Sequence, residues 1–243
     1  PWDDIRVRRA IAMAVDKEDI AKRVYEGFSP VSRGTYLSNS WAFNPNAKEP
    51  AYNLRQAEAL LDEAGFRRGP GGVRMRVTIS DSITLGFKET NEVLREQFKK
   101  IGIEVRIESI EWGAFTEKVL KKYDFDLALL GGPHGPDPDV FCNFVCTGQV
   151  RNSMGYANSK VDELFAQARA AGDRNARKRL YGQAQEILAQ DLPRFNIVEY
   201  AWAYVHRADW EGFYSDKDYQ RKIPRYDLSH VYSKRALGSQ LRK

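Results

Sequence analysis

The sequence predicts an α/β fold with a mainly parallel sheet flanked by helices. Between residues 73 and 130, segments of strand character alternate with segments of helical periodicity, in the order strand–helix–strand–helix–strand. That alternation is typical of parallel strands joined by right-handed crossovers. The apolar segment 125–130 then runs into a loop dominated by Gly, Pro and Asp. Because ligands of open α/β sheets bind beyond the carboxyl ends of the strands, we expect a binding site at this loop.

The chain opens with two predicted helices. Asp3 or Asp4 caps the first helix, over residues 6–15, where apolar side chains recur with a period near 3.6. Asp16 begins the second helix, and Gly27 ends it. Both helices therefore have a polar residue at their start, and the first has an apolar face for a core.

A long loop and a third helix follow. Residues 29–52 are rich in Ser, Asn, Pro and Gly and include Trp41. Loops of this length in compact domains are usually functional, which makes Trp41 a candidate contact. Asn53 then caps a helix over residues 54–64, and Gly65 ends it.

The central segment supplies the predicted sheet. Strands are expected at residues 73–80, 103–110 and 125–130, with helices at 85–100 and 112–122 between them. The carboxyl ends of parallel strands lie at one edge of the sheet, so the residues after each strand should meet there.

The remaining chain is predicted to be helical and then irregular. Helices are expected at residues 159–170 and 174–190, and a final strand at 195–205. The tail beyond that strand has little periodicity.

Composition restricts the class of function. The 243 residues suffice for one large domain or two small ones, and 42% hydrophobic with 29% charged residues is typical of a globular protein. A sequence pI near 9.1 suggests a nucleic-acid-binding domain as one alternative. However, the net charge is only +5, and each basic cluster has acidic neighbours, as residues 174–179 do in Asp173 and Glu186. This pattern indicates solvated helix faces rather than a phosphate-binding stripe.

Catalytic and metal signatures are absent from the sequence. There is no Gly-x-Ser-x-Gly motif, no helix with two His four residues apart and no phosphate-binding loop. A hydrolase using Asp137 or Asp139 is the alternative from the enzyme class. In a Pro-rich turn, however, Asp more often caps the following backbone, so we expect no enzyme. Cys142 and Cys146 have only His134 nearby, which is too few ligands for zinc, and no cofactor is implied.

The candidate ligand contacts follow the predicted strand ends, with one residue from the long loop. They combine aromatic side chains with a few polar groups, as solute-binding clefts do. They are Trp41, Asp81, Ser82, Trp112, His134, Asp137, Asp139 and Phe141.

Five segments, in order, resemble signatures of the extracellular solute-binding protein family 5. These proteins deliver peptides, dipeptides, nickel and oligosaccharides to bacterial ABC importers. The segments are residues 3–16 (DDIRVRRAIAMAVD), 40–45 (SWAFNP), 53–61 (NLRQAEALL), 137–141 (DPDVF) and 155–164 (GYANSKVDEL).

The resemblance implies a periplasmic-binding-protein-like lobe from the carboxyl-terminal half of a longer, two-lobed protein. Residues 1–205 then form the second ligand-binding lobe, and residues 206–243 form the return segment that packs on the first lobe. The implied function is the capture of a peptide-like or other small solute in a cleft between the lobes. The implied partners are importer permease subunits, and the implied location is the periplasm or the outside of the cell, attached to the envelope. We expect the rim formed by Asp81, Trp112 and His134 to be exposed.

Two positions depart from the dipeptide-binding members of this family. In those members an Asp ahead of the Asp-Pro-Asp element holds the ligand's amino group, and an Arg after the first strand of the lobe holds its carboxylate. Here these positions fall at His134 and near Asp81. Both charge complements to a free dipeptide are lost, so we expect a longer peptide, a sugar conjugate, an opine or another small solute. If His134 is the polar anchor, affinity should change near pH ~6.5.

The exported location that the resemblance implies also bears on the two cysteines. Cys142 and Cys146 lie four residues apart, and in an oxidising compartment we expect them to form a local disulfide. The alternative is a pair of small buried thiols.

Overall fold

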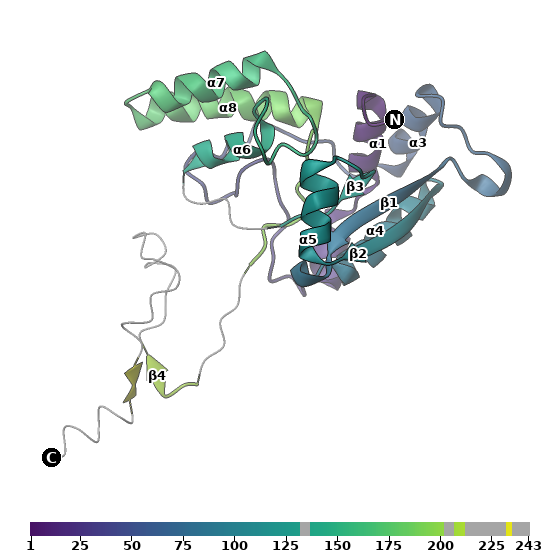
Figure 1. Ribbon diagram of the computed structural model, residues 1–243, viewed down its shortest axis with the longest axis horizontal. Coiled ribbons are helices and arrows are strands. Elements are labelled where there is room, and N and C mark those ends of the chain that lie inside the picture. The colour runs from purple at the N-terminus through teal and green to yellow at the C-terminus, as the bar shows by residue number, and fades with distance from the viewer. Residues whose placement is uncertain (132–136, 202–206, 212–231, 235–243) are drawn as a thin grey trace. The chain divides into compact units, whose positions relative to one another are not determined.

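The computed structural model describes residues 1–131, 137–201, 207–211 and 232–234 (Figure 1). The chain divides into two compact units, Pro1–Ala201 and Trp202–Lys243. In the second unit, β4 (Trp210–Glu211) pairs antiparallel with β5 (Tyr232–Ser233). All other elements belong to the first unit.

The first unit contains the predicted parallel sheet. Strand β1 (Met75–Ser82) lies in the middle, between β2 (Ile103–Ile110) and β3 (Leu127–Ala128), and both neighbours run parallel to it. The fold class predicted from the sequence is therefore confirmed.

Strand β3 is shorter than the expected segment 125–130. The Asp126 carboxylate accepts a hydrogen bond from the backbone N–H of Thr78 at 2.8 Å. This side chain thus satisfies a β1 donor that a longer strand would have paired. Leu129 N still donates to Ser80 O at 3.0 Å just beyond the strand.

Helices cover both faces of the sheet (Figure 1). On one face lie α1 (Ile5–Ala14), α3 (Leu54–Glu63) and α4 (Lys88–Lys100), whose apolar side chains form one core with Val77 and Ile79 of β1. On the other face lie α5 (Trp112–Phe115) and its π-helical continuation Thr116–Lys121.

The first three helices are capped by residues that the sequence predicted as caps. Asp4 accepts from Arg6 N to cap α1, Asp16 accepts from Asp19 N to cap α2 (Lys17–Arg23), and Asn53 accepts from Gln56 N to cap α3. Short polar side chains thus satisfy N–H groups that a first helical turn leaves without partners.

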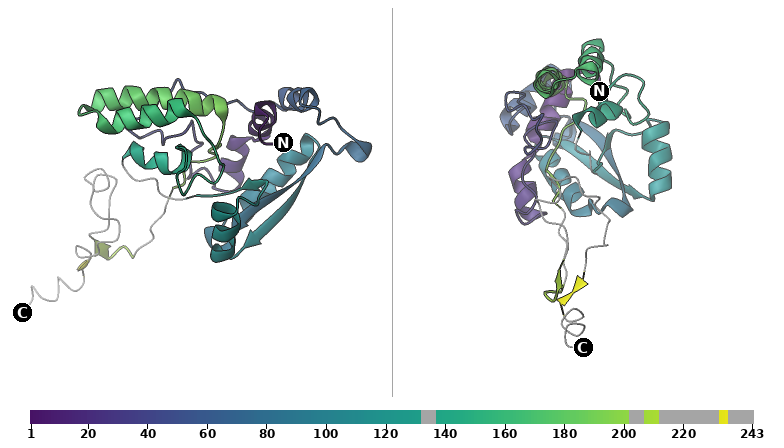
Figure 2. Two further views of the ribbon diagram at one scale, coloured as in Figure 1. Left: turned by 45° about the horizontal axis from the view of Figure 1, so that its top comes forward. Right: turned by 90° about the vertical axis from the view of Figure 1, so that its left-hand side faces the viewer.

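A second hydrophobic cluster lies between the last helices and the long loop. Helices α7 (Ser159–Ala170) and α8 (Arg174–Asp191) run side by side in all views (Figure 2). With α6 (Cys142–Val145) and the loop residues Tyr36 and Ala42 they bury the cluster's side chains.

The predicted strand at residues 195–205 is wrong over its described part. Between 195 and 201 only Val198 forms a bridge, antiparallel to Val31, and residues 202–205 lie outside the described ranges. The segment pairs with the long loop and not with the sheet. Ser32 N donates to Ile197 O, and Glu199 N donates to Pro30 O. Within the described ranges no helix has both the length and the apolar character needed to cross a bilayer.

Candidate ligand-binding site

The Asp-Pro-Asp turn (residues 137–141) is built by its own side chains. Asp137 Oδ1 accepts from Asp139 N at 2.9 Å and so caps the one-turn 3-10 helix Pro138–Phe141. Pro138 at the first helical position has the φ that this turn requires. The capping role weighed for these aspartates in the sequence is thus present for Asp137.

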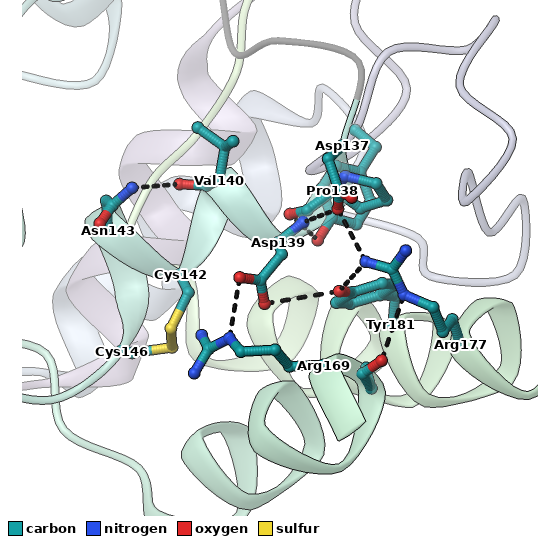
Figure 3. Close-up of polar contacts among 12 residues, drawn as sticks. Asp137, Pro138, Asp139, Val140, Cys142, Asn143, Cys146, Arg169, Arg177 and Tyr181 are labelled. Carbon is teal, nitrogen blue, oxygen red and sulfur yellow. Dashed lines mark hydrogen bonds and ion pairs between the residues drawn. A yellow bond between two sulfur atoms is a disulfide. The ribbon is translucent and has the colours of Figure 1, made fainter. Parts of the chain in front are cut away.

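Asp139 anchors the turn to the α7–α8 pair (Figure 3). Its Oδ2 accepts from Arg169 Nε at 3.0 Å, and its Oδ1 accepts from the Tyr181 hydroxyl at 3.4 Å. The hydrogen bond to Asp139 raises the pKa of Arg169, because it stabilises the charged guanidinium.

Arg177 of α8 is the second anchor. Its Nη2 donates to the Tyr181 hydroxyl at 2.9 Å and to Asp137 Oδ1 at 2.8 Å, and its Nε donates to Ala168 O at 3.1 Å. These two Nη2 bonds raise the pKa of Arg177. The basic segment 174–179 is therefore not only the solvated helix face that its charge pattern indicated, since one of its cations turns inward to fix the turn.

Two predicted aromatic contacts pack against neighbouring tyrosines, Trp41 against Tyr181 and Phe141 against Tyr36. Trp41 lies edge-on to Tyr181, with ring centroids 6.2 Å apart, and the Arg174 guanidinium lies 4.8 Å from the centre of its ring. Phe141 is 3% exposed and packs on Tyr36 at 5.5 Å, so it serves the core in this structure. The structure thus brings Trp41, Phe141 and the two aspartates together against α8.

A disulfide joins Cys142 to Cys146 directly after the turn, with the two Cα atoms 4.9 Å apart. Both residues are buried, and Cys146 N donates to Cys142 O at 2.8 Å. The disulfide and the backbone bond close one turn around α6.

An open pocket of about 470 Å³ lies beside the turn, within the size range of small-molecule sites. Both of its carboxylates already pair with its two arginines. Its walls are formed by Asp137, Asp139, Val140, Cys142, Asn143, Gln149, Arg169, Ala171 and Arg177.

The other predicted contacts lie at the carboxyl ends of β1 and β2. Trp112 is 42% exposed and stacks on Phe115 at 5.8 Å, as expected for the rim. Asp81 and Ser82, in contrast, are buried. The expected exposure of Asp81 is wrong, because its side chain lies on the face of β1 covered by α4, where Asn91 Nδ2 donates to Asp81 Oδ2 at 2.7 Å.

His134 lies outside the described residues, so its part in binding stays a prediction. Among the described residues, no group of three or more His, Cys, Asp or Glu side chains could hold a metal ion.

Sequence reasoning missed Tyr36, Asn91, Arg169 and Tyr181, and it placed Arg177 on a solvated face. The one available signal was the spacing of Arg177 and Tyr181, which lie four residues apart and so share a face of a predicted helix. Their partner Asp137 is 40 residues from Arg177 in the chain, and no local pattern indicates such a pair.

The geometry is that of an α/β unit with polar and aromatic groups at its strand ends. The family model described as bacterial extracellular solute-binding proteins, family 5 Middle, matches residues 1–153. The chain belongs to this family. Members of family 5 are solute-binding proteins and not enzymes.

Two curated relatives illustrate the similarity. The dipeptide-binding protein of Escherichia coli is 28% identical over 222 residues, which cover 89% of this chain and 41% of the relative. The oligopeptide-binding protein AppA of Bacillus subtilis is 30% identical over 206 residues, covering 79% of this chain and 38% of that protein.

A solved structure matches the whole fold of this family 5 chain. It is the periplasmic binding protein DppA of Helicobacter pylori in complex with the peptide STSA, with a TM-score of 0.79 and 26% identity. The match covers 96% of this chain and 44% of that one. The chain thus spans less than half the length of these relatives.

Proposed function

We propose that this chain is a ligand-binding lobe of the substrate-binding component of an ABC importer, which captures a peptide-like or other small solute between two lobes. The main support is the fit of 96% of the chain onto 44% of a family member solved with a bound peptide. In this proposal residues 1–205 form the second lobe, and residues 206–243 form the segment that returns to the first.

The proposed ligand position is the carboxyl-end edge of the sheet, together with the Asp-Pro-Asp turn. Trp112 offers an exposed aromatic surface there. The turn's two carboxylates are held in place by Arg169 and Arg177. Fixed polar groups and an exposed aromatic surface suit a solute with several hydrogen-bonding groups.

The proposed setting is the periplasm or the outer side of a cell envelope, and the proposed partners are permease subunits. The description of the family as extracellular supports the setting. The partners follow from the function of a substrate-binding component.

A thermal-shift screen of the complete gene product with peptides, sugars and opines tests the proposal. A solute at 100 times its dissociation constant should stabilise the folded protein by about 2.7 kcal/mol. Trp112→Ala should weaken binding about tenfold, whereas Tyr52→Ala, which removes an exposed aromatic side chain from the long loop, should leave it unchanged.

The opposite outcome would be a screen in which no solute stabilises the protein. A hydrolytic activity that disappears in Asp137→Ala would then establish the enzyme alternative instead.

A further inference from the structure

The carboxylate of Asp81 is only half satisfied by the described part of the chain. Asp81 is the next-to-last residue of β1, and its side chain is 1% exposed. Its Oδ2 accepts from Asn91 Nδ2 at 2.7 Å, while its Oδ1 is buried and has no hydrogen-bond partner. Buried polar atoms of native proteins are nearly always paired, so this acceptor calls for a donor.

Asn91 presents a second acceptor in the same condition. It is fully buried in α4, and its Oδ1 also has no hydrogen-bond partner. Because Asn91 and Asp81 are hydrogen-bonded to each other, the two orphan oxygens belong to adjacent groups. The missing partner must therefore donate hydrogen bonds, and more than one N–H is needed to reach both oxygens.

The negative charge of Asp81 indicates which kind of donor is missing. Within the described ranges no Lys, Arg or His forms an ion pair with it, whereas Glu104 and Glu108 of β2 both have such partners. The neighbouring hydroxyls are also engaged, since Ser80 donates to Glu108 and Ser82 shares a hydrogen bond with Thr84. A buried carboxylate without a cation is strongly unfavourable, so a positive group fits better than a neutral one.

The residues just beyond β1 and β2 indicate which chemical groups of a ligand would lie next to the positive group. Ser82 pairs with Ile110 at the last register position, so β1 and β2 end at the same edge. Ile83 is 61% exposed and Trp112 is 42% exposed just beyond these strand ends. Exposed apolar side chains therefore lie just beyond the strand ends, next in the chain to Asp81 and to its β2 neighbours.

We propose that Asp81 and Asn91 form a subsite for a cationic nitrogen of the bound solute, either a primary ammonium or a guanidinium. This inference rests on the proposed function and deepens it, because it assigns the solute a positive charge next to an apolar segment. An ammonium or guanidinium has several N–H donors for the two oxygens, whereas a hydroxyl has one. A solute carboxylate is repelled here.

Isothermal titration calorimetry of the complete gene product at pH 7 tests the subsite with three probes. Two are tripeptides blocked by acetyl and amide groups, Ala-Lys-Ala and Ala-norleucine-Ala, which differ only in the ammonium. The third is agmatine, a cation without a peptide bond. The unmutated protein should bind the lysine peptide about tenfold or more tightly than the norleucine peptide, and it should also bind agmatine.

Asp81→Asn should abolish the preference for lysine and the binding of agmatine. Asp124→Asn, which changes an exposed aspartate ahead of β3, is the matched control and should keep both. Without ligand, Asp81→Asn should raise the unfolding midpoint, since it removes an unpaired buried charge and its amide can donate to Asn91. A purely structural Asp81 predicts the reverse, a lower midpoint.

The outcomes separate the two proposals. If both peptides bind equally well to the unmutated and Asp81→Asn proteins, the subsite is wrong and the peptide-binding function stands. If agmatine binds through Asp81 and neither peptide binds, the subsite stands and the peptide-like ligand is wrong. If no probe binds the unmutated protein, the subsite is overturned, and the proposed function is decided by the thermal-shift screen of peptides, sugars and opines.

Discussion

Tyr181 shows how single residues fix the Asp-Pro-Asp turn. Its ring is fully buried in the second hydrophobic cluster, while its hydroxyl accepts from Arg177 and donates to Asp139. Burial raises the pKa of this hydroxyl, so it remains a neutral donor. One side chain thus joins the core of α8 to both charged anchors of the turn.

Replacing that hydroxyl should be measurable. Tyr181→Phe keeps the ring and removes two hydrogen bonds, so the free energy of unfolding should fall by about 1–2 kcal/mol in thermal or denaturant melts. Tyr52→Phe, at an exposed tyrosine, is the control and should have no effect. Equal stability of both variants would mean that the hydroxyl's contacts contribute nothing.

A second residue-scale prediction concerns Glu108 on β2. Its carboxylate pairs with Lys118 and accepts from Ser80, and these contacts, the Lys118 bond above all, lower its pKa. A lowered pKa in the folded state gives stability above the ordinary carboxyl pKa, which is lost as the pH falls through the folded value. Glu108→Gln should therefore reduce stability at pH 7 by up to about 1 kcal/mol, because the pair is partly exposed.

Melts of Glu108→Gln and the unmutated protein across pH should show this difference shrink once the pH falls below the ordinary glutamate pKa of about 4.3, and vanish below the lowered pKa of the folded state. Glu26→Gln, at an exposed glutamate, should follow the unmutated curve throughout. A gap between Glu108→Gln and the unmutated protein that persists in acid would assign the effect to packing instead of charge.

At the scale of elements, the local signals in the sequence were sufficient for most helices and for the sheet. Caps such as Asp16 and Asn53 specify their helices through their own nearest N–H groups, so a short window contains the information. The final strand failed because a run of β-branched and aromatic residues indicates extended backbone but not its partner. The segment contacts the long loop, where Ser38 N and Oγ donate to the Glu199 carboxylate from 161 residues earlier in the chain.

The candidate site was predictable only in part, for the same reason. The sequence located the turn and the strand ends, because each follows an apolar segment. Whether the Asp81 side chain points to solvent or into the core depends on which face of β1 is covered by α4. Its partner Asn91 lies on that helix, so the sequence around Asp81 does not indicate the contact. The arginines that hold the turn likewise come from helices 30 and 40 residues away.

The disulfide gives the prediction at this scale. Thiol titration of the denatured, unreduced protein should find no free thiols. The double variant Cys142→Ala and Cys146→Ala should unfold more easily by about 2 kcal/mol, a modest loss because the bond closes a very short loop. Two free thiols would reject the bond, and unchanged stability would show that α6 holds its shape without it.

At the scale of the molecule, the first unit contains two hydrophobic clusters. One lies under the sheet, and the other lies between α7, α8 and the long loop. Arg8 of α1, a helix of the first cluster, donates to Asp191 O at the end of α8 in the second cluster, at 2.9 Å. This hydrogen bond connects the two clusters. The first unit therefore has the internal contacts of an independently folding body.

The fragment of residues 1–201 should accordingly fold by itself. Its far-ultraviolet circular dichroism should show the helices and strands of the first unit, with one cooperative thermal transition. Ala201 N still donates to Ser29 Oγ, so cutting after this residue preserves the segment 195–201, which pairs with the long loop. A fragment ending at residue 190 loses the end of α8 and the segment paired with the long loop, and it should melt earlier. Similar melting of both fragments would contradict this account.

The middle position of β1 also sets an order of events during synthesis. Its contacts span 28 residues to β2 and 48 residues to β3. At about 5–20 residues per second, β1 waits seconds after leaving the ribosome before either neighbour has emerged as well. During that time both of its edges are unpaired, and unpaired edges are templates for association between chains. The nascent chain therefore exposes both edges of β1 to aggregation while residues 83–128 are emerging from the ribosome, and holding chaperones can protect it in that interval.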